Sequence, residues 1–196
     1  GSAADELGLD GYQAKVFLSI LRPNPETADG QVNTFGDLDG DGVDDPLNTL
    51  ENRQKAVKWQ IDTQLERYRS AGYENLSLVG FYWQEEHIFG DDPDERAVIR
   101  YATDYVHSLG MMLLWFPYYQ AQEFGEWKSL GFDIACLQPN YSFMSVTDPD
   151  RLDSTALQAR MFGMCVEMEL SAWSNRLNIE RYKEYIQKGI EYGYMD

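Results

Sequence analysis

The chain has 196 residues, of which 43% are hydrophobic and 14% aromatic, so we expect a single α/β domain over 1–196 with a sizeable core. Its 33 acidic residues against 16 Lys and Arg give a formal charge of −17, which repels phosphate backbones and anionic lipids and argues against nucleic acid as a partner. No window approaches the run of about eighteen apolar residues that a membrane helix needs, and we expect no membrane insertion.

The first half of the chain predicts two strands and a helix between them. Strand-forming residues occupy 15–21, and a long polar loop follows. Apolar residues at helical spacing predict a helix over 48–71, with Asn48 and Glu51 as a capping box and Gly72 as its end. The uncharged run 76–84 predicts a strand covered on both faces, as in a parallel sheet flanked by helices.

The second half continues the alternation of strands and helices. Asp92 and Pro93 are expected to begin a helix that ends near Leu109. Further strands are predicted at 111–119, 133–140 and 164–170, a short helix or turn at 123–130, and helices at 150–162 and 178–192. This order implies right-handed crossovers and a parallel sheet with helices outside. Five strands do not close a parallel barrel, which needs about eight, so the sheet is open or the chain is an incomplete barrel.

Acidic residues stand at the ends of two predicted strands. In parallel α/β proteins the C-terminal ends of the strands are where active sites are built. Side chains alternate across a strand, so Glu167 and Glu169 share one face, and we expect Glu86 to meet one of them across the mouth of the fold. Two opposed carboxylates, one protonated and one ionised, are what glycoside hydrolysis requires. The alternative is that these acids are solvated or paired with Arg.

Aromatic and amide residues gather near the same strand ends. Aromatic faces can stack on pyranose rings, and amides can bond sugar hydroxyls. Taken singly, each aromatic residue is as readily part of the core, and each amide part of a turn. The candidate ligand contacts are Tyr82, Trp115, Tyr118, Gln138, Asn140 and Tyr141, with Trp83, Phe116, Tyr119 and Trp173 nearby.

Residues 37–45 have the pattern D-x-D-x-D-G-x-x-D. Oxygen atoms at alternate positions suit a hard cation, and Gly42 allows the sharp turn. The twelfth position is Asn48 and not the Glu of an EF-hand, so a short calcium loop or a plain acidic turn are the two interpretations. No cofactor is expected to be required beyond this structural Ca²⁺. The candidate ligands are Asp37, Asp39, Asp41, Asp45 and the carbonyl of Val43.

The two cysteines, Cys136 and Cys165, each lie in an apolar run. Their number and spacing predict neither a disulfide framework nor a zinc site.

Several motifs agree in order and spacing with a known family. They are LVGFYW at 78–83 followed by Glu86, FPYY at 116–119, GFD at 131–133, QPNY at 138–141 and VEME at 166–169. On these residues, and over about 12–195, the chain resembles domain of unknown function 4855. That family is known mainly from secreted proteins of gut Bacteroidetes and related bacteria. It resembles a (β/α)8 barrel of glycoside-hydrolase type and has no established activity.

The resemblance implies a TIM-barrel-like (β/α)8 architecture in which this chain supplies the equivalents of strands 3 to 7. Family members have two further strands before Lys15 and one after Met195, which another segment or chain is expected to supply. Glu86 would then follow the fourth strand, and Glu167 and Glu169 the seventh. These positions hold the acid/base and the nucleophile in the large retaining-glycosidase clan.

We therefore expect a glycoside-hydrolase-like domain that acts on a polysaccharide or glycan. Glu86 is the expected general acid/base and Glu169 the nucleophile or base, with Glu167 as the alternate. A non-catalytic carbohydrate-binding domain and an inactive barrel fragment are the alternatives. The resemblance also implies an extracellular, periplasmic or cell-surface location.

Overall fold

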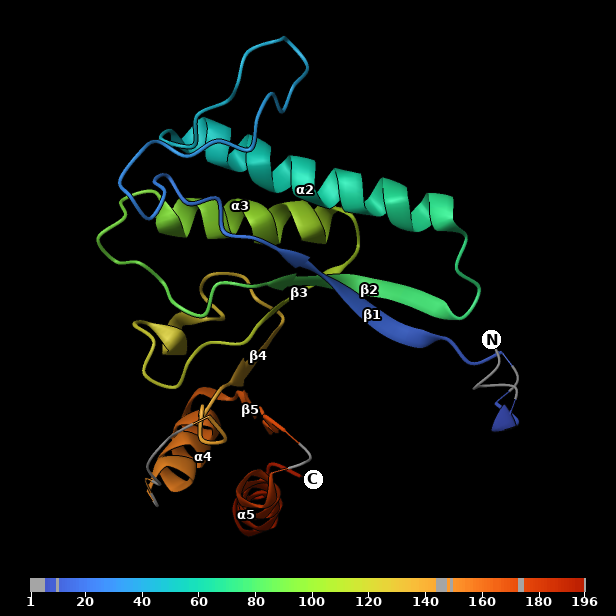
Figure 1. The fold of residues 1–196 in the computed structure, drawn as a ribbon, viewed down its shortest axis with the longest axis vertical. Helices are drawn as coiled ribbons and strands as arrows, with labels where there is room; N and C mark the ends of the chain where they lie inside the picture. The colour runs from blue at the N-terminus through green and yellow to red at the C-terminus, as the bar shows by residue number, and fades with distance from the viewer. Residues whose placement is uncertain (1–5, 10, 144–147, 149, 173–174, 196) are drawn as a thin grey trace. The chain divides into compact units, whose positions relative to one another are not determined.

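A computed structural model describes residues 6–9, 11–143, 148, 150–172 and 175–195. It is an α/β fold with a five-stranded parallel sheet in the order β1-β2-β3-β4-β5, flanked by helices (Figure 1). The predicted class is therefore confirmed, and the sheet is open, with β1 and β5 as its edges. The strands are β1 Ala14–Ile20, β2 Leu76–Trp83, β3 Met112–Trp115, β4 Ile134–Leu137 and β5 Cys165–Val166; the helices are α2 Leu50–Ala71, α3 Glu95–Ser108, η1 Phe124–Glu126, α4 Arg151–Phe162 and α5 Arg176–Tyr192.

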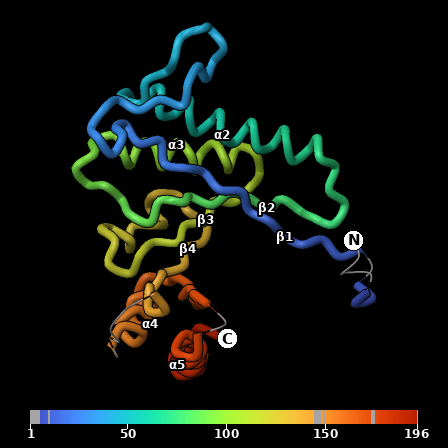
Figure 2. The backbone as a smooth tube through the Cα atoms, in the orientation of Figure 1, coloured from blue at the N-terminus to red at the C-terminus, as the bar shows by residue number. Residues whose placement is uncertain are grey.

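The chain divides into two compact units. The N-terminal unit comprises 1–84 and 91–114, and the C-terminal unit comprises 85–90 and 115–196. Each unit contains helices that pack beside its own strands, as the backbone trace shows (Figure 2). No described helix is both long and apolar enough to cross a membrane.

In the N-terminal unit, α2 buries the stripe that its sequence predicts. Val57 and Ile61 are fully buried and Leu65 is nearly so. The helix is capped by Thr49, whose hydroxyl accepts the N–H of Asn52, so the expected cap at Asn48 is wrong by one residue. Thr49 has the extended backbone that an N-cap requires, and its hydroxyl bonds a free N–H of the first turn. The helix ends at Gly72 in the left-handed conformation, as predicted.

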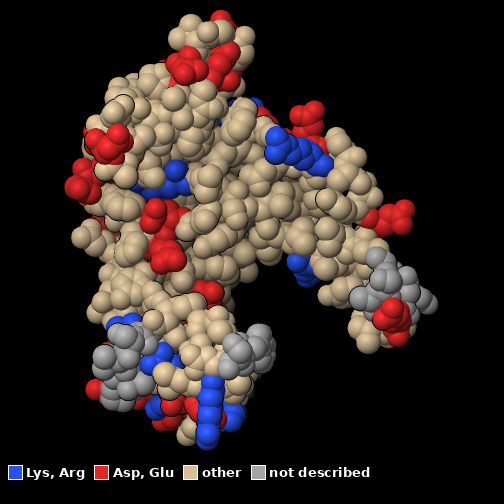
Figure 3. Space-filling model, viewed as in Figure 1, with Lys and Arg blue, Asp and Glu red and all other residues tan. Residues whose placement is uncertain are grey.

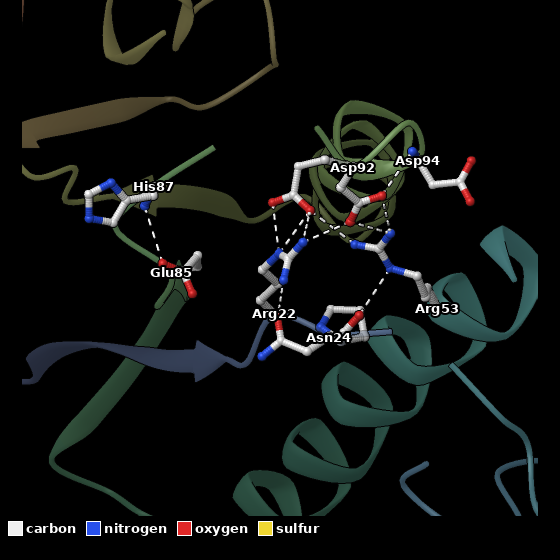
Figure 4. Close-up of polar contacts among 9 residues, drawn as sticks. Arg22, Asn24, Arg53, Glu85, His87, Asp92 and Asp94 are labelled. Atoms are coloured by element: carbon white, nitrogen blue, oxygen red, sulfur yellow. Dashed lines mark hydrogen bonds and ion pairs between the residues drawn. The ribbon is translucent and has the colours of Figure 1, made fainter. Parts of the chain in front are cut away.

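The helix α3 begins at Glu95 and not at Pro93. The side chain of Asp92 accepts the N–H of Asp94 at 3.0 Å and also belongs to a buried cluster of charges. Arg22, which follows β1, and Arg53 of α2 both point toward Asp92 (Figure 4), at 2.7 Å and 2.8 Å. The same two guanidinium groups bind Glu95 at 2.7 Å and 3.0 Å. We call these four residues the charge cluster.

Two strands of the N-terminal unit approach each other closely at Gly80. A Cβ atom at this position would lie 2.0 Å from the carbonyl oxygen of Met112, which is far inside contact distance. Only glycine is therefore compatible with this part of β2.

In the C-terminal unit, β4 and β5 are parallel, with Cys136 opposite Cys165 and Leu137 opposite Val166. The strand β5 is shorter than the predicted 164–170, although the N–H of Glu167 still donates to Leu137 O at 3.0 Å. Helix α4 covers one face of these strands, where Ala159 packs with Leu137 and Val166. Helix α5 contributes Tyr185 to a second core cluster with Tyr141, Leu152 and Met168.

Candidate functional site

Three predicted acids, Glu86, Glu167 and Glu169, lie together in the C-terminal unit. Glu86 belongs to the segment 85–90, and its carbonyl oxygen accepts the N–H of Tyr118 at 3.3 Å. Glu167 and Glu169 follow β5. Burial raises the pKa of both Glu167 and Glu169, and the negative charge of Glu86 adds to each rise, which places Glu86 within electrostatic range of both. We call them the carboxylate cluster.

Glu169 is buried and held by donors from two directions. The hydroxyl of Tyr185 donates to its Oε2, and the backbone N–H of Tyr141 donates to the same atom at 3.1 Å. Asn140 adopts a left-handed backbone with φ 55°, which Asn tolerates better than most residues, just before this N–H. Burial raises the pKa of Glu169, while the Tyr185 hydroxyl and the backbone N–H groups of Tyr141 and Asn140 oppose the rise. The carboxylate is thus fixed in one orientation.

Glu167 has a different environment. Burial raises its pKa to about 7, and the charges of Glu169 and Glu86 add to the rise. Its Oε2 atom is buried and has no hydrogen-bond partner within the described part of the chain. A carboxyl group of this kind holds its proton up to neutral pH, so it can donate that proton to a bound molecule.

The predicted ligand-contact residues fall into two groups. Trp115 is fully buried: it stacks on Phe132 at 5.1 Å between ring centroids, and its indole N–H donates to the Glu85 carbonyl at 2.7 Å. Tyr141 is 4% exposed, and its hydroxyl donates to Glu184. Both therefore support the core of the unit rather than offer a free ring face.

Tyr118, Gln138 and Asn140 are half-buried in the same unit. Tyr118 lies 5.7 Å from the ring of His87, and the amide of Gln138 donates to the Phe116 carbonyl at 2.5 Å. Tyr82 belongs to the N-terminal unit, and Trp173 lies outside the described residues. Of the predicted contacts in the unit of the carboxylate cluster, Tyr118, Gln138 and Asn140 are therefore the ones that are not fully buried.

Sequence reasoning missed Tyr185. The buried residues of α5 are Asn178, Arg181, Tyr185 and Gly189, a spacing that follows the helical period. The pattern could have placed Tyr185 on the buried face. The helical pattern carries no signal that the Tyr185 hydroxyl reaches Glu169, because that contact depends on how α5 packs on the segment after β5.

The acidic loop brings together three of its five predicted ligands. Oxygen atoms of Asp37, Asp39 and Asp45 lie within 4.8 Å of one another, with Asp45 buried and the other two exposed. Lys55 Nζ binds Asp39 at 2.8 Å and Asp45 at 3.1 Å, so an ammonium group neutralises part of this charge. The carboxylate of Asp41 accepts the N–H of Val43 at 2.8 Å, inside its own turn, and is not part of this group. We call Asp37, Asp39 and Asp45 the acidic triad.

Comparison with known proteins identifies a family over the whole chain. The family model described as Domain of unknown function (DUF4855) matches residues 1–196. Searches of curated proteins and of solved structures find no match.

Proposed function

The chain belongs to the DUF4855 family, and from the carboxylate cluster of its C-terminal unit we propose that it is a glycoside-hydrolase-like domain acting on a polysaccharide or glycan. One observation carries the proposal. Two acids two residues apart have opposite hydrogen-bonding environments: Glu169 is held by donors, whereas Glu167 has a buried oxygen without a described partner and a pKa raised to about 7. Such a pair can divide acid and base roles at one pH.

In this proposal Glu167 donates its proton to the glycosidic oxygen as the bond breaks. Glu169, ionised and oriented by Tyr185, stabilises the developing positive charge on the sugar, attacks it, or activates a water. Burial keeps the proton on Glu167, and the negative charges of Glu169 and Glu86 add to this effect. The sequence-based assignment made Glu86 the acid/base and Glu167 the alternate, and separate variants distinguish the two versions.

Binding of a neutral sugar fits the remaining features. The formal charge of −17 disfavours anionic ligands. Tyr118, Gln138 and Asn140 are half-buried in the unit that holds the carboxylate cluster, and an aromatic ring and amides are the side chains that bind sugars, although the amide nitrogen of Gln138 already donates to the Phe116 carbonyl.

The test is a release assay and a binding screen on plant and host polysaccharides. Glu167→Gln and Glu169→Gln should each lower release by at least about 10²-fold, the usual contribution of acid–base catalysis, while binding is retained. Glu180→Gln, at an exposed position of α5, is the matched control and should release at the wild-type rate. Loss of release in Glu86→Gln with normal release in Glu167→Gln would favour the sequence-based assignment.

Other results would exclude the proposal. Wild-type protein that binds glycans and releases nothing is a carbohydrate-binding domain. Normal release by Glu86→Gln, Glu167→Gln and Glu169→Gln would remove the carboxylate cluster from the reaction.

We also propose that the fold is part of a TIM-barrel-like (β/α)8 architecture in a protein that acts outside the cell, at the surface or in the periplasm. The support is the sequential order of five parallel strands with helices between them, which a (β/α)8 barrel shares. An experimental structure of a longer polypeptide that includes this chain tests it: strands pairing with both β1 and β5 are expected, and a sheet that ends at either strand would contradict the barrel.

For the acidic triad we propose a structural Ca²⁺ site. Three carboxylates with oxygens inside 4.8 Å provide hard ligands, and Ca²⁺ has to displace Lys55 from two of them. Added Ca²⁺ should raise the melting temperature of the wild type, and Asp39→Ala should abolish that rise. Asp41→Asn, outside the triad, should retain it. Equal melting temperatures of wild type and Asp39→Ala with Ca²⁺ and with chelator would exclude the site.

A further inference from the structure

The two cysteines, far apart in the sequence, lie opposite each other in the sheet. Cys136 of β4 and Cys165 of β5 are register partners in a parallel pair. Neighbouring strands are separated by about 4.8 Å, and disulfides join Cα atoms that are usually about 4.4 to 6.8 Å apart. The sequence alone indicated no disulfide, because nothing in it places 136 beside 165.

Both thiols lie on the face that Glu167 shares. Leu137 and Val166 pack with Ala159 of α4, so the residues that alternate with them along the two strands point to the opposite face. Burial raises the pKa of the Cys136 thiol, and the Cys165 thiol and the charge of Glu167 add to that rise. The three groups are therefore close neighbours.

The two thiols differ in access. Cys165 is exposed on the edge strand, whereas Cys136 is half-buried. A reagent in solution meets Cys165 first. Cys136 is less accessible and lies beside Cys165, so it is placed to attack a group bound to Cys165, which is the arrangement of an attacking and a resolving cysteine.

We propose that Cys136 and Cys165 form a redox-active dithiol that closes to an intramolecular disulfide by exchange with a low-molecular-weight disulfide such as oxidised glutathione. The Cys165 thiolate attacks one glutathione sulfur and releases the first glutathione thiolate. The Cys136 thiol then attacks Sγ of Cys165, loses its proton as the bond forms, and releases the second glutathione, which leaves with that proton. Both protein thiols lose their protons, two electrons pass to the glutathione disulfide, and two molecules of reduced glutathione leave. This inference holds for the open sheet, in which β5 is an edge strand, and does not rest on the proposed glycan chemistry.

The strand geometry predicts that this disulfide is easily reduced. Side chains of register partners in parallel strands run side by side, so their Cβ atoms lie nearer the strand spacing of about 4.8 Å than the usual disulfide value of about 3.8 Å. Closing the bond strains the pair, and strained disulfides are the labile, regulatory ones. The bond would link the edge strand β5 to β4 two residues before Glu167.

The experiment treats reduced protein with excess oxidised glutathione and follows intact mass and free thiols. Wild type should lose both thiols and a mass of two hydrogens, carry no glutathione, and regain both thiols with dithiothreitol. Cys136→Ser should keep one stable glutathione on Cys165. Cys165→Ser should react at least tenfold more slowly than Cys136→Ser, because its remaining thiol is half-buried. Circular dichroism verifies that each variant is folded.

Three outcomes would overturn the inference. They are a stable glutathione adduct on the wild type, disulfide-linked dimers through Cys165, and two thiols that stay free in the folded protein. Peptide mapping after alkylation has to identify the Cys136–Cys165 bond for the inference to stand.

Discussion

Glu167 makes the stability of the folded chain depend on pH. Its pKa is about 7 in the folded protein and near its ordinary value of 4.5 in an unfolded chain, so between these values the folded state binds more protons. The free energy of unfolding must then fall as pH rises from about 4.5 to about 7. Glu167→Gln removes this contribution, and urea titrations across this range should show a shallower pH dependence than the wild type. The same dependence in both proteins would show that Glu167 has an ordinary pKa.

Tyr185 positions Glu169 through a single hydroxyl. Tyr185→Phe keeps the ring in the core and removes the donor, which leaves a buried acceptor with one bond fewer. We expect a loss of about 1–3 kcal/mol in the free energy of unfolding, because the acceptor is a buried carboxylate. Tyr194→Phe is the matched control, since its hydroxyl donates to a neutral carbonyl, that of Tyr185, and should cost about 0.5–1.5 kcal/mol. Equal losses in urea titrations would argue against a special role for Tyr185.

At the scale of elements, the charge cluster connects the end of β1 with α2 and the start of α3. Glu95 is 1% exposed and binds both Arg22 and Arg53, so Glu95→Gln leaves two buried guanidinium groups with one ionised partner. Removal of one member of a buried ion pair costs about 3–5 kcal/mol, and we expect a loss in this range on chemical denaturation. Lys58→Gln, which breaks the exposed Lys58–Asp62 pair of α2, should cost less than about 1 kcal/mol. A similar small loss in Glu95→Gln would mean that the cluster is not stabilising.

The boundaries of α2 and α3 show which features local sequence patterns predict correctly. The buried stripe and end of α2 follow from helical spacing and Gly72, and both are confirmed. The start of α3 lies at Glu95 and not at Pro93, although Asp92 accepts the N–H of Asp94 on its side chain at 3.0 Å while it also binds Arg22 and Arg53. Cap preference acts within one turn, whereas the ion pairs of Asp92 come from residues distant in the sequence.

At the scale of the whole molecule, the excess of acidic residues opposes folding. Acidic side chains are spread over the visible face of both units (Figure 3), and the formal charge is −17. Raising NaCl from about 0.01 M to about 0.1 M shortens the Debye length from about 30 to about 10 Å and weakens this repulsion. We expect the melting temperature at pH 7 to rise over this range.

The control for charge repulsion is the same salt experiment at a pH where the protein carries little net charge. Near the isoelectric point of about 4.3 the net charge is close to zero, and the same salt increase should leave the melting temperature nearly unchanged. A fall of the melting temperature with salt at pH 7 would show that attractive ion pairs outweigh the repulsion.

The sequence by itself determined the α/β class, the parallel sheet with flanking helices, and the family, because strand and helix periods and short motifs are properties of neighbouring residues. Parity along one strand predicts that Glu167 and Glu169 share a face, but β5 ends at Val166, so strand alternation does not extend to Glu169. Only the tertiary structure decided that Tyr185 reaches Glu169, that Trp115 is buried, and that Cys136 faces Cys165. Those relations depend on strand register and helix packing, which are set by contacts between residues far apart in the chain.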